Sequence, residues 1–258
     1  MVAYFEASGS RHPTPAPITP NIDSEKSAVA KIVERLSAGR GFCFFTLNLD
    51  HLYKLQSDPQ FAAAYRSADF VSADGWPIAW LARRRGVSVE RTTGSDLIDP
   101  ICAAAASKGF SVYVVGPGAR SRRVAMSVLA RRHRGLRFAG SESPTLPEWA
   151  DDAALAALAA RIRESGAQMC LLSLGSPKQE LLAWRLRSLC PQVGFIGVGA
   201  GMDFVSGHAM RAPSTLRRCN LEWMWRLLCH PGRLGPRYWR CGVFFAEVLG
   251  RSIFRSAH

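Results

Sequence analysis

Short apolar runs recur along the chain and alternate with segments that carry apolar residues at helical spacing. Runs typical of buried strands cover residues 42–47, 68–72, 111–115, 169–174 and 193–198. Helical spacing is found from residue 24 to the glycines near 40, after residue 75, and at residues 97–107, 120–134, 150–165 and 181–189. Strands that alternate with helices predict an α/β fold with a Rossmann-like sheet flanked by helices.

Residues 171–213 contain two consecutive strand–glycine turn–helix units. The first turn contains Gly175, Ser176, Pro177, Lys178 and Gln179. Proline suits the first turn of a helix, glycine permits close approach of a ligand, and the free N–H groups of a helix start attract anions. Two such units predict a ligand crevice at the carboxyl ends of parallel strands. The alternative is ordinary strand–helix packing, with glycines present only for the turns.

The second glycine turn, residues 199–201, begins with Gly199. We expect Asp203, His208 and Arg211 in the loop that follows it.

Polar residues also follow two of the earlier strands. Thr46, Asn48, Asp50 and His51 lie at the end of the run 42–47, and Asp74 follows the run 68–72. Asn48, Asp50 or Asp74 could each be a helix N-cap. At the mouth of a sheet, Asp74 could instead act as a general base that accepts the proton of an acceptor hydroxyl. Spacing alone leaves both interpretations open.

Arg91 and the hydroxyl-rich turn that contains Thr93 are candidates for binding a diphosphate, because a guanidinium group pairs with two phosphate oxygens. The turn at residues 116–118 is Gly-Pro-Gly. It lacks the third glycine and the acidic strand end of a dinucleotide site, which argues against an NAD-dependent oxidoreductase.

The net charge of +13 in 258 residues is unusual, and arginine supplies most of it. Such a balance indicates nucleic acid, an anionic membrane or a phosphorylated substrate as a partner. The seven cysteines include no Cys-x-x-Cys pair, so a zinc site is not expected. No signal-peptide pattern is found, and no apolar run reaches the roughly 18 residues that span a bilayer. We therefore expect a cytoplasmic protein with reduced thiols.

Composition divides the chain into three parts. Residues 1–24 are rich in proline and predict a flexible N-terminal arm, residues 25–213 form the α/β core, and residues 214–258 form a basic, Trp-rich appendage. Pro231 and Pro236 are expected to break the appendage into short helices. Its aromatic and basic side chains suit a membrane interface, and the alternatives are nucleic-acid binding or a terminal helix packed on the core.

Several short motifs, taken together, resemble the WecG/TagA/CpsF family of bacterial glycosyltransferases. In chain order they are Thr46-Leu47-Asn48, Ala73-Asp74-Gly75, Glu90-Arg91-Thr92-Thr93-Gly94-Ser95-Asp96-Leu97, Gly175-Ser176-Pro177-Lys178-Gln179-Glu180, Gly197-Val198-Gly199-Ala200, Gly207-His208-Ala209-Met210-Arg211-Ala212-Pro213 and Leu221-Glu222-Trp223-Met224-Trp225-Arg226-Leu227, with Arg237-Tyr238 downstream. The resemblance covers most of the chain. It departs from many relatives at Trp76 and Pro77, where smaller aliphatic residues are common, and in its Trp-rich tail.

The resemblance implies an inverting, metal-independent transferase without a cofactor. The donor would be a UDP-sugar, and the acceptor a sugar on a polyprenyl diphosphate at the inner face of the cytoplasmic membrane. The products of such enzymes are teichoic acid, enterobacterial common antigen or exopolysaccharide. The sequence agrees in having no Asp-x-Asp metal motif. A homo-oligomer is possible, and the charge alone leaves a basic α/β nucleic-acid-binding protein as the alternative.

The resemblance assigns the catalytic base to Asp74. The predicted substrate-binding residues are Thr46, Asn48, Arg91, Thr93, Gly175, Ser176, Pro177, Lys178, Gln179, Gly199, Asp203 and Arg211. The predicted acceptor or membrane residues are Arg217, Arg218, Arg226, Arg233 and Arg237. No metal ligands are predicted.

Overall fold

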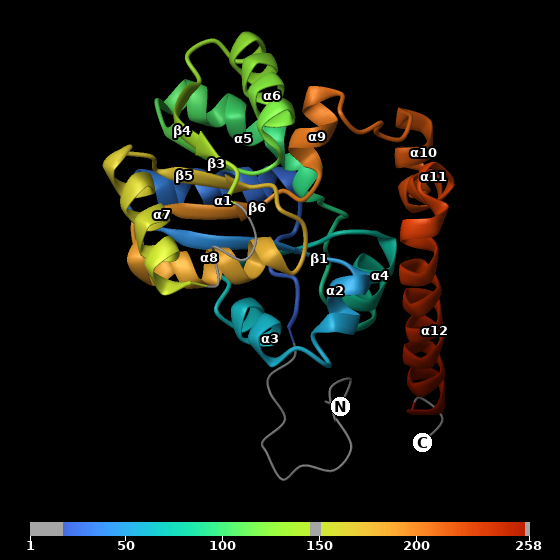
Figure 1. Cartoon of the computed structure of the whole chain (residues 1–258). Coiled ribbons are helices and arrows are strands. Elements are labelled where there is room, and N and C mark those ends of the chain that lie inside the picture. Colours follow the sequence, from blue (N-terminus) through green and yellow to red (C-terminus); the bar gives the residue numbers. More distant parts are fainter. Residues whose placement is uncertain (1–17, 145–150, 256–258) are drawn as a thin grey trace.

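The sheet of this protein has six strands, all parallel, in the order β2-β1-β6-β5-β3-β4. The computed structural model describes residues 18–144 and 151–255 (Figure 1). The strands are β1 (Phe42–Leu47), β2 (Phe70–Ala73), β3 (Ser111–Val115), β4 (Arg137–Glu142), β5 (Met169–Leu172) and β6 (Gly194–Gly197). The α/β prediction is confirmed. Only β4 was not predicted, because its residues are half-buried or exposed and form no apolar run.

Helices cover both faces of the sheet and bury a separate core on each. One face carries α1 (Glu25–Ser37), α5 (Gly94–Lys108), α6 (Ala119–Arg132) and α9 (Gly201–Ser206). The other face carries α3 (Pro59–Arg66), α4 (Trp76–Arg84), α7 (Asp152–Glu164) and α8 (Lys178–Leu189). In β1 all six residues are buried: Phe42 and Phe44 belong to the first core, whereas Phe45 and Leu47 belong to the second. This alternation explains an unbroken apolar run.

Because every strand is parallel, all six carboxyl ends lie at one edge of the sheet. Leu47 pairs in register with Ala73, and Leu172 pairs with Gly197. The next residues continue the alignment, since Asp74 N donates to Leu47 O (2.8 Å) and Val198 N donates to Leu172 O (2.9 Å). The predicted site residues that follow these strands therefore lie side by side at the same edge of the sheet.

The N-terminal boundary differs from the prediction. Residues 1–17 lie outside the described residues, but the end of the predicted arm, 18–24, packs on the edge strand. Asn21 exchanges two hydrogen bonds with Val71 of β2, at 2.9 and 2.8 Å, and Ile22 is fully buried. Ser24 then caps α1 by accepting a hydrogen bond from Ser27 N. Proline content alone does not reveal these contacts with a strand about 50 residues away.

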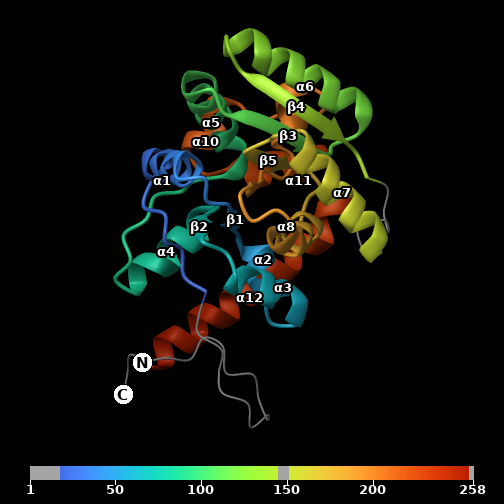
Figure 2. The ribbon, with the colours of Figure 1, turned by 90° about the vertical axis from the view of Figure 1, so that its left-hand side faces the viewer.

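The appendage consists of α10 (Ser214–Arg218), α11 (Glu222–Cys229) and α12 (Pro231–Arg255). The expectation that Pro236 ends a helix is wrong: α12 runs through it as one long helix beside the core (Figures 1 and 2). Proline removes one backbone hydrogen bond. The loss is offset because Leu234, Phe244 and Val248 form an apolar face that is buried.

A second short helix, α2 (Leu49–Lys54), begins directly after β1 and contacts α12. Among the described helices, none combines the length and the hydrophobicity required to cross a membrane.

Candidate active site at the carboxyl edge of the sheet

Asp74 is the first residue after β2 and lies half-buried at the carboxyl edge of the sheet. Helix α4 takes Gly75 as its N-cap, without a side-chain hydrogen bond, so the N-cap alternative for Asp74 is wrong. The Asn48 side chain instead acts on the carboxylate of Asp74 and lowers its pKa. The carboxylate of Asp74 is therefore not used as a helix cap.

Asn48 serves two purposes. Its Oδ1 accepts a hydrogen bond from His51 N (3.0 Å) and caps α2, as one of the sequence alternatives proposed. Its Nδ2 lies 3.3 Å from His51 Nε2, and the side chain also favours the ionised form of Asp74. The start of α2 thereby acts on the Asp74 carboxylate.

The pKa of Asp74 is raised from 3.8 to about 6. Burial is the largest cause, and the carboxylate of Glu222 in α11 adds to it, whereas Asn48, Arg226 and Arg91 act in the opposite direction. At neutral pH the group is ionised, and its raised pKa makes it a stronger proton acceptor than an ordinary aspartate. These are the properties required of a general base.

Three arginines surround Asp96 in the first turn of α5. Arg211 is hydrogen-bonded to it, Arg91 Nη2 lies 3.4 Å from Oδ2, and Arg217 Nη1 lies 3.7 Å from Oδ1. Burial alone would raise the pKa of Asp96, but Arg211 and the Thr93 hydroxyl outweigh it and the pKa is lowered. Three cations around one carboxylate leave an excess of positive charge. The cluster can therefore attract a doubly charged anion.

Arg91 connects this cluster to Asp74. Its backbone forms a parallel bridge with Ala73, the residue before Asp74, and its charge lowers the pKa of both Asp74 and Asp96. The positive cluster and the proton acceptor are thus neighbours at one edge of the sheet.

The expected turn at residues 92–96 is partly helix, because α5 already begins at Gly94. Thr93 is its N-cap and accepts from Asp96 N at 3.1 Å, while its hydroxyl donates to Asp96 Oδ2 at 2.8 Å. A Cβ on Gly94 would lie 2.7 Å from Gly197 O. Only glycine lets the start of α5 pack directly on the end of β6.

Gln179 joins the two glycine turns that the sequence singled out. Gly199 N donates to Gln179 Oε1 (3.0 Å), and Gln179 Nε2 donates to Glu180 Oε1 (2.8 Å). Both ends of the amide are thus used inside the protein. Burial raises the pKa of Glu180 to about 7, so this carboxyl is partly protonated at neutral pH. The half-buried residues Gly175, Ser176, Pro177 and Lys178 form the surface of the turn.

The appendage reaches this edge of the sheet at three points. Arg217 of α10 lies beside Asp96, Glu222 and Arg226 of α11 act on Asp74, and Arg237 of α12 lies 3.1 Å from Asp50 of α2. Arg218 is exposed, and the side chain of Arg233 is outside the described part of the chain. Three of the five predicted acceptor or membrane arginines therefore lie next to site carboxylates.

The family model of the glycosyl transferase WecG/TagA/CpsF family matches residues 18–258. The chain belongs to this family. Glycosyl transfer is the family's activity, and it requires a sugar donor and an acceptor.

Two residues of this WecG/TagA/CpsF glycosyltransferase lie differently from the expectation. Asp203 lies on α9 rather than in a loop, and its carboxylate accepts a hydrogen bond from Ser121 of α6 (2.6 Å), which joins these two helices. Thr46 is buried, and its carbonyl accepts from the hydroxyl of Tyr65 (2.9 Å). In this structure Asp203 links α9 to α6, and the backbone of Thr46 binds Tyr65.

Sequence reasoning assigned no role to Asp96 or Glu222 in this WecG/TagA/CpsF glycosyltransferase, and it considered Asp50 as a helix N-cap. The cap of α2 is Asn48, and Asp50 lies in the first turn of that helix. Asp96 and Glu222 stand inside recognised motifs, which was the available signal. Arg211 and Arg217 lie more than 100 positions from Asp96, and Glu222 lies more than 100 positions from Asp74, so no local spacing reveals these contacts. Arg91, by contrast, is five positions from Asp96. In the described residues there is no group of three or more His, Cys, Asp or Glu side chains arranged to hold a metal ion.

Proposed function

We propose that this protein is an inverting, metal-independent glycosyltransferase. It transfers a hexose or an N-acetylhexosamine from a UDP-sugar to a sugar on a polyprenyl diphosphate, during synthesis of a bacterial exopolysaccharide or other surface glycan. The observation that carries the proposal is the position of Asp74, a carboxylate with a pKa of about 6, beside the arginine cluster.

The proposed reaction is a single displacement. Asp74 accepts the proton of the acceptor hydroxyl while the hydroxyl oxygen attacks the anomeric carbon on the face opposite UDP. The bond between that carbon and the β-phosphate oxygen breaks, and its electron pair stays with UDP. Arg91, Arg211 and Arg217 stabilise this charge together with backbone N–H groups of the glycine turns. Fixed donors of this kind supply what a metal ion would supply otherwise.

We propose that the protein works at the inner face of the cytoplasmic membrane, and the appendage supports this location. Its helices expose large apolar side chains, namely Trp223, Leu228, Trp239 and Val243. They lie on α11 and α12 among arginines, and an amphipathic helix with such side chains binds an anionic lipid surface. A lipid-linked acceptor would be met at that surface.

The test is UDP release from a panel of UDP-sugars, with and without a polyprenyl-diphosphate-linked sugar. We expect release with one donor only when the lipid acceptor is present. Asp74→Asn should bind UDP as the unchanged protein does and should lower turnover by about 100-fold or more. Turnover that survives the substitution would remove Asp74 from the mechanism. Failure of every donor and acceptor pair would contradict the proposed activity.

A further inference from the structure

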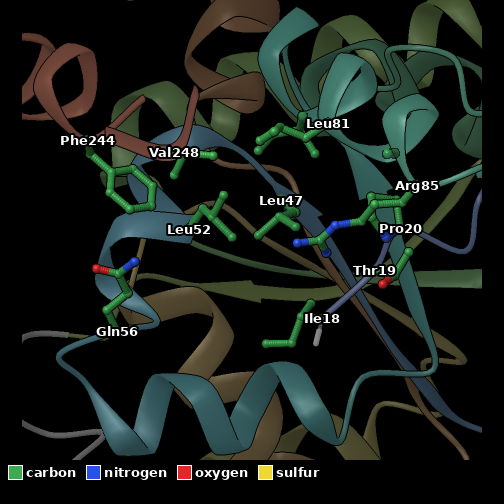
Figure 3. Close-up of a pocket in the computed structure, with 12 residues that line it drawn as sticks. Ile18, Thr19, Pro20, Leu47, Leu52, Gln56, Leu81, Arg85, Phe244 and Val248 are labelled. Atoms are coloured by element: carbon green, nitrogen blue, oxygen red, sulfur yellow. The ribbon is translucent and has the colours of Figure 1, made fainter. Parts of the chain in front are cut away.

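An apolar pocket lies beside the candidate active site and has no role in the mechanism above (Figure 3). It is a groove between several elements of the fold and is partly open to solvent. Its walls come from the segment before α1, the end of β1, α2, α4 and α12. The apolar lining includes Ile18, Leu47, Leu52, Leu81, Phe244 and Val248.

The pocket shares its walls with the proposed general base. Leu47 lines it, and the carbonyl of Leu47 accepts the hydrogen bond of Asp74 N (2.8 Å). Ile78 and Leu81 lie on α4, which begins two residues after Asp74. A ligand in the pocket would therefore continue directly into the site at which the acceptor hydroxyl is required.

Charged and aromatic side chains frame the pocket. Arg85 points its guanidinium group toward Leu47 (Figure 3). Arg237 and Lys54 lie at Asp50 on the neighbouring turn of α2, so basic groups outnumber the acid there. On the α4 side, Trp76 is 44% exposed and its ring contacts that of Phe245 in α12 (5.5 Å between centroids). The pocket thus combines an apolar interior with a basic, aromatic frame.

This combination selects the class of ligand. A free sugar nucleotide would leave its hydroxyls without hydrogen-bond partners against the apolar walls. A hydrocarbon chain with an anionic head fits both the interior and the frame. We propose that the pocket takes the isoprene units next to the diphosphate of the acceptor, and so selects lipid-linked acceptors over soluble ones. The inference rests on the proposed function, because the hydrocarbon chain is part of the proposed acceptor.

The experiment compares the binding of farnesyl diphosphate with the binding of inorganic pyrophosphate by calorimetry. We expect the unchanged protein to bind farnesyl diphosphate at least tenfold more tightly. Ala82→Phe fills the pocket from α4 and should remove that preference, while pyrophosphate and UDP still bind. The matched control is Ala130→Phe at an exposed position on α6, which should keep the preference.

A second variant covers the case in which Ala82→Phe does not fold. Leu81→Asn keeps the branching and the number of side-chain heavy atoms but makes the wall polar, and it should also reduce the preference for farnesyl diphosphate about tenfold. Its control is Val124→Asn on α6, where the side chain is 41% exposed.

The inference and the proposed function fail in distinguishable ways. Equal binding of the two ligands by the unchanged protein, or an unaltered preference in the pocket variants, would overturn the pocket assignment even if UDP release requires the lipid acceptor. Conversely, a farnesyl preference that the variants remove would uphold the pocket even if no UDP-sugar is turned over.

Discussion

The carboxylate of Glu222 in α11 acts electrostatically on Asp74, the residue that follows β2. The raised pKa of Asp74 depends on burial first and on Glu222 second. A residue of the appendage thereby adjusts the basicity of a residue of the core. The position of α11 consequently affects the pKa of Asp74 as well as the packing.

This arrangement predicts the pH dependence of the reaction. Asp74 must be ionised to accept a proton, so kcat/KM should fall about tenfold for each pH unit below a pKa of about 6. Glu222→Gln removes a negative charge that opposes ionisation, and the acidic limb should move to lower pH. A pH–rate profile of both proteins measures this. Glu247→Gln on exposed α12 surface is the control, and an unmoved limb in Glu222→Gln would contradict the pairing.

A substitution in the arginine cluster should weaken the binding of UDP. Arg211→Gln removes a cation at Asp96, and a hydrogen bond to a charged group contributes about 1.5–3 kcal/mol, so UDP should bind roughly tenfold to a hundredfold more weakly. Titration with UDP measures the change. Arg132→Gln is the matched control, because Arg132 pairs with Asp99 elsewhere on α5 (2.5 Å). Equal affinities in the two variants would exclude Arg211 from the donor site.

At the scale of elements, α12 is held on the core by a charged contact and an apolar face. Arg237 lies 3.1 Å from Asp50, while Phe244 packs its ring on Tyr53 of α2 (5.8 Å between centroids). These contacts join the helix that contains Pro236 to α2. The same helix also forms one wall of the apolar pocket.

Removal of the charged contact should loosen α12. Arg237→Ala leaves the buried Asp50 with Lys54 as its remaining cation (2.7 Å), and hydrogen exchange of α12 amides should become about tenfold faster, a change of roughly 1.4 kcal/mol. Glu247→Ala, exposed on the same helix, should leave exchange unchanged. If both variants exchange at the rate of the unchanged protein, the Arg237–Asp50 pair does not hold the helix.

For the whole molecule, the appendage presents one face to the core and another outward. Trp239 is 75% exposed and Leu228 is 71% exposed, whereas Leu234 and Val248 are buried. The excess of basic residues gives the chain a net charge of +13, which attracts it to an anionic surface. The exposed apolar groups add hydrophobic contact with the same surface.

The exposed face of the appendage predicts membrane binding that depends on both apolar contact and positive charge. Combined Trp239→Glu and Leu228→Glu substitutions should lower co-sedimentation with anionic lipid vesicles at least tenfold, because apolar contact is lost and negative charge is added. The binding of the unchanged protein should weaken as salt rises. Val124→Glu, exposed on α6, is the control. Vesicle binding that survives the double substitution would place the membrane surface elsewhere.

Local pattern was sufficient for much of the fold. The buried runs identified β1 and β3 with the bounds that the structure has, since a strand covered on both faces needs apolar side chains at every position. The order of motifs identified the family, and the polar residues after β1 and β2 identified the edge at which Asp74 and Asn48 meet.

Long-range contacts account for the remainder. Arg211 reaches Asp96 across 115 positions, Glu222 acts on Asp74, and α12 continues through Pro236 because packing outweighs one lost hydrogen bond. None of these contacts depends on neighbours in the chain, so they cannot be predicted from local periodicity or propensity. The appendage adds Arg217 and Glu222 to the charges of the site, and Phe244 and Val248 to the apolar walls, only when it folds back onto the sheet.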